Sequence, residues 1–220
     1  MRIVATPMCE EILIMAGITD YLVNKHPDME EADFAVVLSE TETQMPSLKI
    51  KLNTFPQIKE SILKIAEIYN SAINSQLNSN YPLNDLDYPL TDLDLNLSLT
   101  LSKISPWANS KQKKILRKNN RKIKVKVYSL FLKDIIEDMG YLVVGENPDF
   151  VVFPDYLEEK ITKTTDIQIN SKDKSKIDES DKYNDVKYLK VPSHGDVPIN
   201  PLERAAMRYK LLEGELCMKP

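Results

Sequence analysis

The chain has 220 residues, of which 42% are hydrophobic and 28% charged, with a net charge of −4 and only two cysteines. This composition excludes a disulfide framework, and the negative charge argues against nucleic acid as a general partner. The longest apolar stretch, 12–18, is too short to cross a membrane, and no signal-peptide pattern precedes it. We therefore expect a cytoplasmic protein. Five glycines leave no phosphate-cradling loop of the kinds found in nucleotide enzymes.

The first half of the chain alternates between strand and helix patterns. Thr6 is a plausible helix N-cap, and Pro7 fits the first helical position, where no amide hydrogen is needed. The expected elements are strands at 2–5, 32–38 and 48–52 and helices at 9–23 and 57–73.

The second half has a similar pattern, with Gly140 as a helix C-cap. We expect strands at 123–128, 141–144 and 149–153 and a helix at 130–139. The stretch NPDFVVFPDYL parallels EADFAVVLSET of the first half, and each follows a strand, a helix and a glycine. The likeness indicates either an internal repeat of one β-α-β unit or two similar solutions to the same packing problem.

Compositionally biased sequence separates these parts. The first biased insert is 71–122. Its residues 71–110 are built mainly from Asn, Leu, Asp and Ser, and their Leu-Asp alternation is compatible with an edge hairpin or with no fixed structure. Residues 158–185 have no sustained apolar period and are typical of a loop or a disordered insert. Residues 186–220 are interpreted as a loop and a helix that Asn200 caps and that runs to about residue 218.

Together these patterns predict one Rossmann-like α/β domain over residues 1–220. Its mostly parallel sheet is built from two β-α-β halves, 1–70 and 123–157, with disordered or low-complexity inserts.

Ligands of open parallel sheets bind at the carboxyl ends of the strands, where loops and helix N-termini present amide hydrogens. The polar loops that follow predicted strands, together with the turn near residue 194, therefore supply the candidate binding residues. These are Thr6, Met8, Cys9, Ser39, Glu40, Thr41, Asp155, Ser193 and His194. The carboxylates of Glu40, Glu42 and Asp155 have the chemistry to bind a divalent cation, but no motif spacing supports this, so we assign no metal ligand.

Cys9 has two interpretations. In the first turn of a helix, the helix dipole favours a thiolate, which would act as a nucleophile or as a ligand of a soft metal. Glu10 and Glu11 oppose ionisation, however, and free cysteines are more often buried packing residues. We favour the packing interpretation.

The stretch VPSHGDVP at 191–198 contains one of only two histidines. Ser193, His194 and Asp196 have the residue types of a nucleophilic relay, but such relays are assembled from distant segments. A proline-bounded turn is the favoured interpretation. If the chain has a catalytic centre, His194 is its best acid-base group.

Residues 111–126 carry nine lysines and arginines and no acid. Such a run could contact the phosphates of RNA or an acidic protein, but no aromatic side chains are interleaved within it to stack on bases. A solvated surface is the favoured interpretation.

The two ends of the chain, TPMCEEILIMAGI and NPLERAAMRYKLLEGELCMKP, resemble the conserved uncharacterised proteins of methanogenic archaea, the methanogenesis-marker kind. The resemblance spans about residues 1–69 and 123–157 and the C-terminal helix, without the inserts. It implies an accessory role around methanogenic cofactors or methyl-coenzyme M reductase, and it assigns no catalytic residue.

Three functional hypotheses follow. The first is an accessory protein that binds a small anionic or metal-containing cofactor at the strand-end edge, with a role in the maturation of a methanogenesis-related cofactor or enzyme. The second is an enzyme that uses Cys9 or His194. The third is an interaction subunit that uses the basic segment 111–126. The first ranks highest because the sequence contains no recognisable catalytic constellation.

Overall fold

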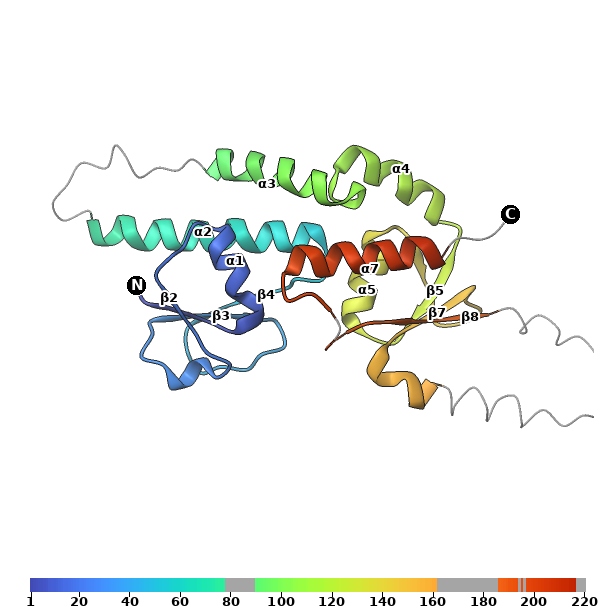
Figure 1. Cartoon of the computed structure of the whole chain (residues 1–220), viewed down its shortest axis with the longest axis horizontal. Coiled ribbons are helices and arrows are strands. Elements are labelled where there is room, and N and C mark those ends of the chain that lie inside the picture. The colour runs from blue at the N-terminus through green and yellow to red at the C-terminus, as the bar shows by residue number, and fades with distance from the viewer. Residues whose placement is uncertain (78–89, 162–185, 194, 196, 217–220) are drawn as a thin grey trace, which may run out of the picture. The chain divides into compact units, whose positions relative to one another are not determined.

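The computed structural model describes residues 1–77, 90–161, 186–193, 195 and 197–216. It confirms the α/β class, since every strand pairing among the described residues is parallel and α-helices alternate with strands along much of the chain (Figure 1). We expected both halves to contribute to one sheet. Instead, the strands of the described residues form two four-stranded sheets, because each half pairs its strands among themselves.

The chain groups into two compact units. Unit 1 comprises Met1–Asn109 and Pro198–Ala206, and unit 2 comprises Ser110–Val197 and Met207–Pro220. The predicted halves, 1–70 and 123–157, lie within units 1 and 2 respectively, whereas the C-terminal stretch 186–220 contributes to both.

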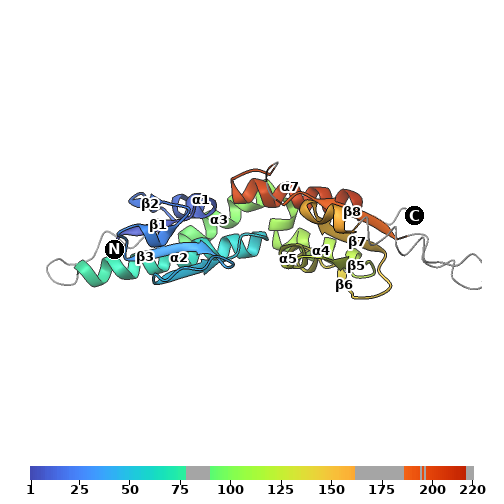
Figure 2. The ribbon, with the colours of Figure 1, turned by 90° about the horizontal axis from the view of Figure 1, so that it is seen from below.

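Unit 1 contains a sheet of order β2-β1-β3-β4. Figure 2 labels β2, β1 and β3 of this sheet. Its strands are β1 (Ile3–Ala5), β2 (Tyr21–Val23), β3 (Phe34–Leu38) and β4 (Ser47–Ile50). Its helices are α1 (Glu10–Met15), α2 (Phe55–Leu77) and α3 (Leu90–Ile104), with short 3-10 turns η1 (Pro7–Cys9), η2 (Pro27–Met29) and η3 (Pro106–Ala108). On one face of this sheet, Val4, Ala35 and Val37 form a buried cluster. Strand alternation points Ile3, Ala5 and Val36 to the other face.

Unit 2 contains a sheet of order β6-β5-β7-β8, which is the same order shifted by four strands (Figure 2). Its strands are β5 (Lys124–Val127), β6 (Leu142–Val143), β7 (Phe150–Pro154) and β8 (Lys187–Val191). Its helices are α4 (Ser110–Asn120) and α5 (Leu130–Asp138), with the 3-10 turn η4 (Asp155–Leu157). The helix α7 (Pro201–Glu215) contributes its first six residues to unit 1 and the remainder to unit 2.

The internal likeness of the two halves extends to individual hydrogen bonds. In unit 1, the carboxylate of Asp33 accepts the backbone N–H of Arg2 at 2.6 Å, and the Asp33 N–H donates to the Arg2 carbonyl. In unit 2, Asp149 makes the same pair of bonds with Lys124, with a carboxylate distance of 2.7 Å. Asp33 therefore joins the start of β3 to the start of β1, and Asp149 joins the start of β7 to the start of β5. This equivalence favours the interpretation of the two halves as an internal repeat.

This aspartate contact predicts a matched set of variants. Asp149→Ala removes the acceptor at the start of β5, and we expect it to lower the free energy of unfolding by about 1 kcal/mol, the usual net value of one hydrogen bond. Asp149→Asn keeps a side-chain oxygen and should lose less. Urea unfolding of both variants measures the difference, and two variants that unfold like the unmodified protein would contradict the assigned role.

The helix predicted over residues 9–23 is wrong in its length. The α-helix ends at Met15, and the following Gly17 has a φ of 79°, a left-handed conformation that glycine adopts without strain. The N–H of Ile18 returns to the carbonyl of Leu13, which is the pattern of a helix C-cap. The next residues are free to extend as the edge strand β2.

The insert predicted as poorly ordered over 71–122 is also corrected where the structure describes it. Residues 71–77 continue α2, and α3, η3 and α4 occupy most of 90–120, whereas 78–89 lie outside the described residues. The alternating leucines also fit a helix. Leu97 and Leu101 are four residues apart and both are buried, whereas Leu95 and Leu99 are exposed, so every second leucine lies on the buried face. Trp107 is 2% exposed and adds a large side chain to this packing.

The strand β8 was not predicted, because residues 186–200 were interpreted as a loop. Its residues pair with the whole of β7, from Phe150 opposite Lys187 to Pro154 opposite Val191. Only Val191 is fully buried, as expected of an edge strand, so the apolar signal of KYLKV is weak. Most of the predicted insert 158–185 lies outside the described residues.

Candidate functional site at the strand ends

Both sheets have a topological switch point, the position at which the strand order reverses. It lies between β1 and β3 in unit 1 and between β5 and β7 in unit 2. The same hydrogen bond marks both places: the N–H of Thr6 donates to Val36 at 3.1 Å, and that of Tyr128 donates to Val152 at 3.2 Å. Crevices at the carboxyl ends of strands beside a switch point are the usual ligand sites of open α/β sheets.

In unit 1 the switch point brings Thr6 and Cys9 together. Thr6 precedes η1 as predicted, but its side chain makes no capping hydrogen bond. Its hydroxyl instead donates to Cys9 Sγ at 3.3 Å, and both side chains are buried. Met8 is half-buried in the same turn. Pro7 begins η1 and so starts the turn that aims these side chains, which explains why the strand breaks at Thr-Pro.

The thiol of Cys9 is held in its neutral form. Burial raises its pKa to about 11, and this effect exceeds the opposing influence of the Thr6 hydrogen bond and of the positive charge on Arg204. At neutral pH the sulfur is therefore a weak nucleophile and a poor metal ligand. These features favour the interpretation of Cys9 as a packing residue.

The raised pKa of Cys9 predicts a pH dependence of stability. Because the folded-state value of about 11 lies above the ordinary value of 9.0, the neutral thiol favours folding below pH 9, and this contribution is lost as pH rises toward 11. We expect the unfolding free energy to fall by about 2–3 kcal/mol more in the unmodified protein than in Cys9→Ala over that range. Urea titrations from pH 8 to 11 provide the test, and equal slopes for the two proteins would refute this burial.

The loop after β3 is a compact turn. The Ser39 hydroxyl donates to Glu40 at 2.6 Å, and the Thr41 N–H donates to the carbonyl of Leu38 at 2.9 Å. Glu40 and Glu42 are exposed here in unit 1, whereas Asp155 belongs to unit 2. Within the described ranges, no group of three His, Cys, Asp or Glu side chains could hold a metal ion.

In unit 2 the structure joins two predicted residues, Asp155 and Ser193. The Ser193 hydroxyl donates to one oxygen of the Asp155 carboxylate, and the Ser193 N–H donates to the other at 3.2 Å. This contact links the end of β7 to the loop after β8. His194 and Asp196 lie outside the described residues, so the proposed role of His194 stays a prediction.

Arg208 reinforces this edge of unit 2. Its Nη2 donates to the carbonyl of Ser193 at 2.9 Å and its Nε to that of Pro192 at 3.1 Å. The guanidinium also lies over the ring of Phe131, 4.8 Å from the ring centre. The buried guanidinium of Arg208 therefore holds the loop after β8 in place and also contacts Phe131 of α5.

Sequence reasoning missed Arg204, the most unusual residue at the edge of unit 1. Asn200 caps α7 as predicted, since its side-chain oxygen accepts the N–H of Leu202 at 2.9 Å. One turn into the helix, Arg204 is only 3% exposed, and its Nη1 donates to the carbonyls of Pro198 and Ile199 at 3.2 and 3.0 Å. Burial lowers the pKa of its guanidinium, which the field of Cys9 partly offsets.

A signal for this burial existed in the sequence. Arg204, Arg208 and Leu212 recur at every fourth position and so share one helix face, and Leu212 is an apolar residue of the kind that packs in a core. Two arginines on the same helix face as a core leucine indicate that both arginine side chains are buried.

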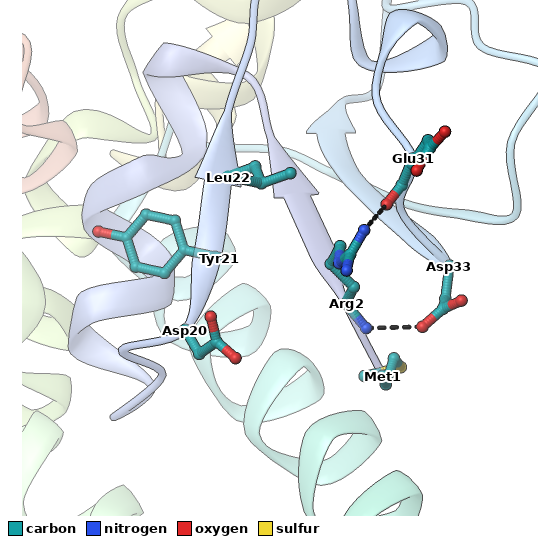
Figure 3. Close-up of a pocket in the computed structure, with 7 residues that line it drawn as sticks. All are labelled: Met1, Arg2, Asp20, Tyr21, Leu22, Glu31 and Asp33. Carbon is teal, nitrogen blue, oxygen red and sulfur yellow. Dashed lines mark hydrogen bonds between the residues drawn. The ribbon is translucent and has the colours of Figure 1, made fainter.

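The opposite edge of the first sheet carries a polar pocket of about 630 Å³ (Figure 3). It lies at the amino ends of the strands, where Arg2 donates from its backbone to Asp33 and from Nη1 to the carbonyl of Glu31 at 2.9 Å. Asp20 also lines it. The Tyr21 ring borders the pocket, while its hydroxyl bonds to Glu10 of α1. These contacts anchor the amino ends of the strands, and the pocket lining carries charges of both signs.

The fold is one found among solved bacterial metal- and laminin-binding proteins. It is similar to a zinc-bound mutant of AdcAII from Streptococcus pneumoniae, with a TM-score of 0.51 and 10% identity over 99% of each chain. It is also similar to a mutant of the laminin-binding adhesin Lmb from Streptococcus agalactiae, with a TM-score of 0.54 and 8% identity over 98% of this chain and 99% of that one. A zinc-bound deletion mutant of ZnuA gives a TM-score of 0.51 and 11% identity over 100% and 99% of the two chains.

At such low sequence identities, the structural similarity shows a shared fold and nothing more. No protein-family model and no curated protein matches the sequence. None of the described helices is both long and apolar enough to span a membrane.

Proposed function

We propose that this chain is an accessory binding protein that holds a small anionic or metal-containing cofactor at the carboxyl ends of its parallel strands. The observation that carries the proposal is the switch point of unit 1, where Thr6, Cys9 and the buried cation of Arg204 meet. Two of the structurally similar proteins were solved with zinc, which supports a ligand-binding role for this fold.

The chemistry of the described residues limits the classes of ligand that the site can bind. A bare metal ion needs several His, Cys, Asp or Glu ligands, and the part of the chain that the structure describes offers no group of three. We therefore propose that any metal held by the described residues comes with ligands of its own, as part of a cofactor. The neutral thiol of Cys9 argues against the alternative of a thiolate enzyme, and an enzyme that uses His194 remains a hypothesis.

Purification of the intact protein from its native host tests this function. Elemental analysis and mass spectrometry of the gently purified protein should find one small anionic or metal-containing compound per chain. Protein that is free of any small molecule, and whose thermal unfolding is unchanged by the small-molecule extract of the same cells, would contradict the proposal.

The resemblance to methanogenesis-marker proteins gives this proposal a finer form. We propose that the cofactor belongs to methanogenesis and that the protein acts in the cytoplasm, in the maturation of a cofactor or an enzyme. The compound that co-purifies decides the matter, because a ligand without any part in methanogenesis would refute the finer form while leaving the binding function intact.

One observation favours a second role, as an interaction subunit. None of the residues of α4 is buried, and Ile115 is 66% exposed among Lys114 and Lys118, which are exposed as well. Such a face suits an acidic protein or RNA. Replacing both lysines with glutamate should abolish salt-sensitive capture of such a partner. Capture that is unchanged by the two substitutions would eliminate this role.

A further inference from the structure

We propose that Arg204 forms an oxyanion-binding site at the carboxyl edge of the first sheet, and that it receives a carboxylate or phosphate group of the ligand. This inference rests on the proposed binding function and adds the group that the site recognises and the residue that recognises it.

The first argument is a buried charge without a counter-charge. Arg204 is 3% exposed, and its hydrogen bonds within the described part of the chain go to two backbone carbonyls, both through Nη1. None of the described carboxylates forms an ion pair with it. Burying a cation is costly unless an anion or a full set of hydrogen bonds compensates it, so such a site favours an anion from outside.

The second argument concerns Cys9, the ionisable side chain that interacts electrostatically with the Arg204 guanidinium. Its thiol is neutral at pH 7, since burial raises its pKa to about 11. The thiol therefore supplies no negative charge, and the positive charge at this edge persists under physiological conditions.

The third argument is access. Every fully enclosed side-chain nitrogen or oxygen of the described residues has a hydrogen-bond partner. The Nε and Nη2 atoms of Arg204 have none in the described part of the chain, so they must reach the accessible surface. These two nitrogens form one side of the guanidinium fork, and their parallel N–H groups match the two oxygens of a carboxylate or a phosphate.

Nuclear magnetic resonance of the unmodified protein tests the site directly. The chain has five arginines, so the Nε–H region is sparse, and Arg204→Lys identifies the Arg204 signal by its loss. We expect this signal to shift saturably on titration with sodium phosphate or sodium succinate, at an ionic strength held constant with sodium chloride. Saturation by one salt alone would identify the preferred anion. A shift that grows linearly with both salts, or no shift, would overturn the inference.

Two variants complete the experiment. Arg204→Gln keeps polar donors but removes the charge, and phosphate or succinate should bind at least tenfold more weakly, as measured by calorimetry. Lys210→Gln removes an exposed charge from the same helix and should leave binding unchanged. Equal losses in both variants would show a general charge effect and overturn the site.

The outcome of these measurements is separable from that of the proposed function. If the protein co-purifies with a cationic or neutral compound and the Arg204 signal is inert, the binding function stands and this inference fails. If no compound binds under any condition and the signal is inert, both fail.

Discussion

Replacing Asp138 with alanine should destabilise unit 2 far more than the removal of an exposed carboxylate, by about 2–4 kcal/mol. Asp138 of α5 accepts the hydroxyl of Tyr209 from α7 and pairs with Lys113 of α4 at 2.5 Å. Tyr209 is fully buried, and the side chains of Lys113 and Asp138 are each 14% exposed. The alanine variant leaves a buried hydroxyl and a largely buried ammonium without their acceptor.

The control for this variant is Glu137→Ala on the same helix. Glu137 is about half exposed and lies 3.8 Å from Lys133, a surface pair of the kind that contributes little. Urea unfolding followed by circular dichroism should show a clear loss for Asp138→Ala and almost none for Glu137→Ala. Similar unfolding midpoints for the two variants would show that Asp138 does not link these helices.

Replacing Gly140 with alanine should also be strongly destabilising, by about 2–4 kcal/mol. Gly140 has a φ of 84°, which a residue with a side chain adopts only with strain. An added Cβ would also lie 2.7 Å from Cβ and 2.9 Å from Cα of Arg117 in α4. The backbone there would have to move, since neither atom is the end of a flexible side chain.

Gly17→Ala separates the two causes. Gly17 occupies the equivalent C-cap in unit 1 with a φ of 79°, and an added Cβ there would have no atom within 4 Å. The free energy of unfolding of this variant should fall by only about 1 kcal/mol, the cost of the left-handed backbone conformation alone. Thermal unfolding of both variants gives the comparison. An equal loss for Gly17→Ala and Gly140→Ala would mean that the close approach of Arg117 costs nothing.

The same two glycines illustrate how much of the fold the sequence could predict. Gly140 was interpreted correctly as a C-cap, because a clear strand pattern follows it. Gly17 is equivalent in structure, but the apolar residues Tyr21 to Val23 that follow it also fit a continuing helix. Local patterns therefore predicted the buried strands and long helices well, and they failed where the partner of a segment decides its structure, as in the edge strands β2 and β8.

Alternation was misleading in the region of α3. Leucines at every second position contain every fourth position as well, so the pattern suits a strand or a helix. Packing decides between them: Lys59 of α2 pairs with Asp94 at 2.6 Å and donates to Ser98 at 2.8 Å, which holds α3 along α2 (Figure 1). No local signal in the sequence could reveal that contact.

The candidate site was predictable in part. The strand-end rule selected Thr6 and Cys9, which the structure brings together. It also selected Asp155, which the structure joins to Ser193, a candidate from the predicted turn at 191–198. It could not select Arg204, because this residue comes from the C-terminal helix and meets the first strand end only through tertiary packing.

Hydrogen–deuterium exchange of the intact protein is the most direct test of ligand binding at the carboxyl edge of unit 1. Samples with and without the anion that saturates the Arg204 signal, phosphate or succinate, should differ in peptides that cover 6–12 and 198–206, with slower exchange when the anion is present. Peptides that cover 20–22 and 31–33, at the amino edge, should exchange equally in both samples. Slower exchange confined to the amino edge, or identical exchange throughout, would contradict ligand binding at the carboxyl edge.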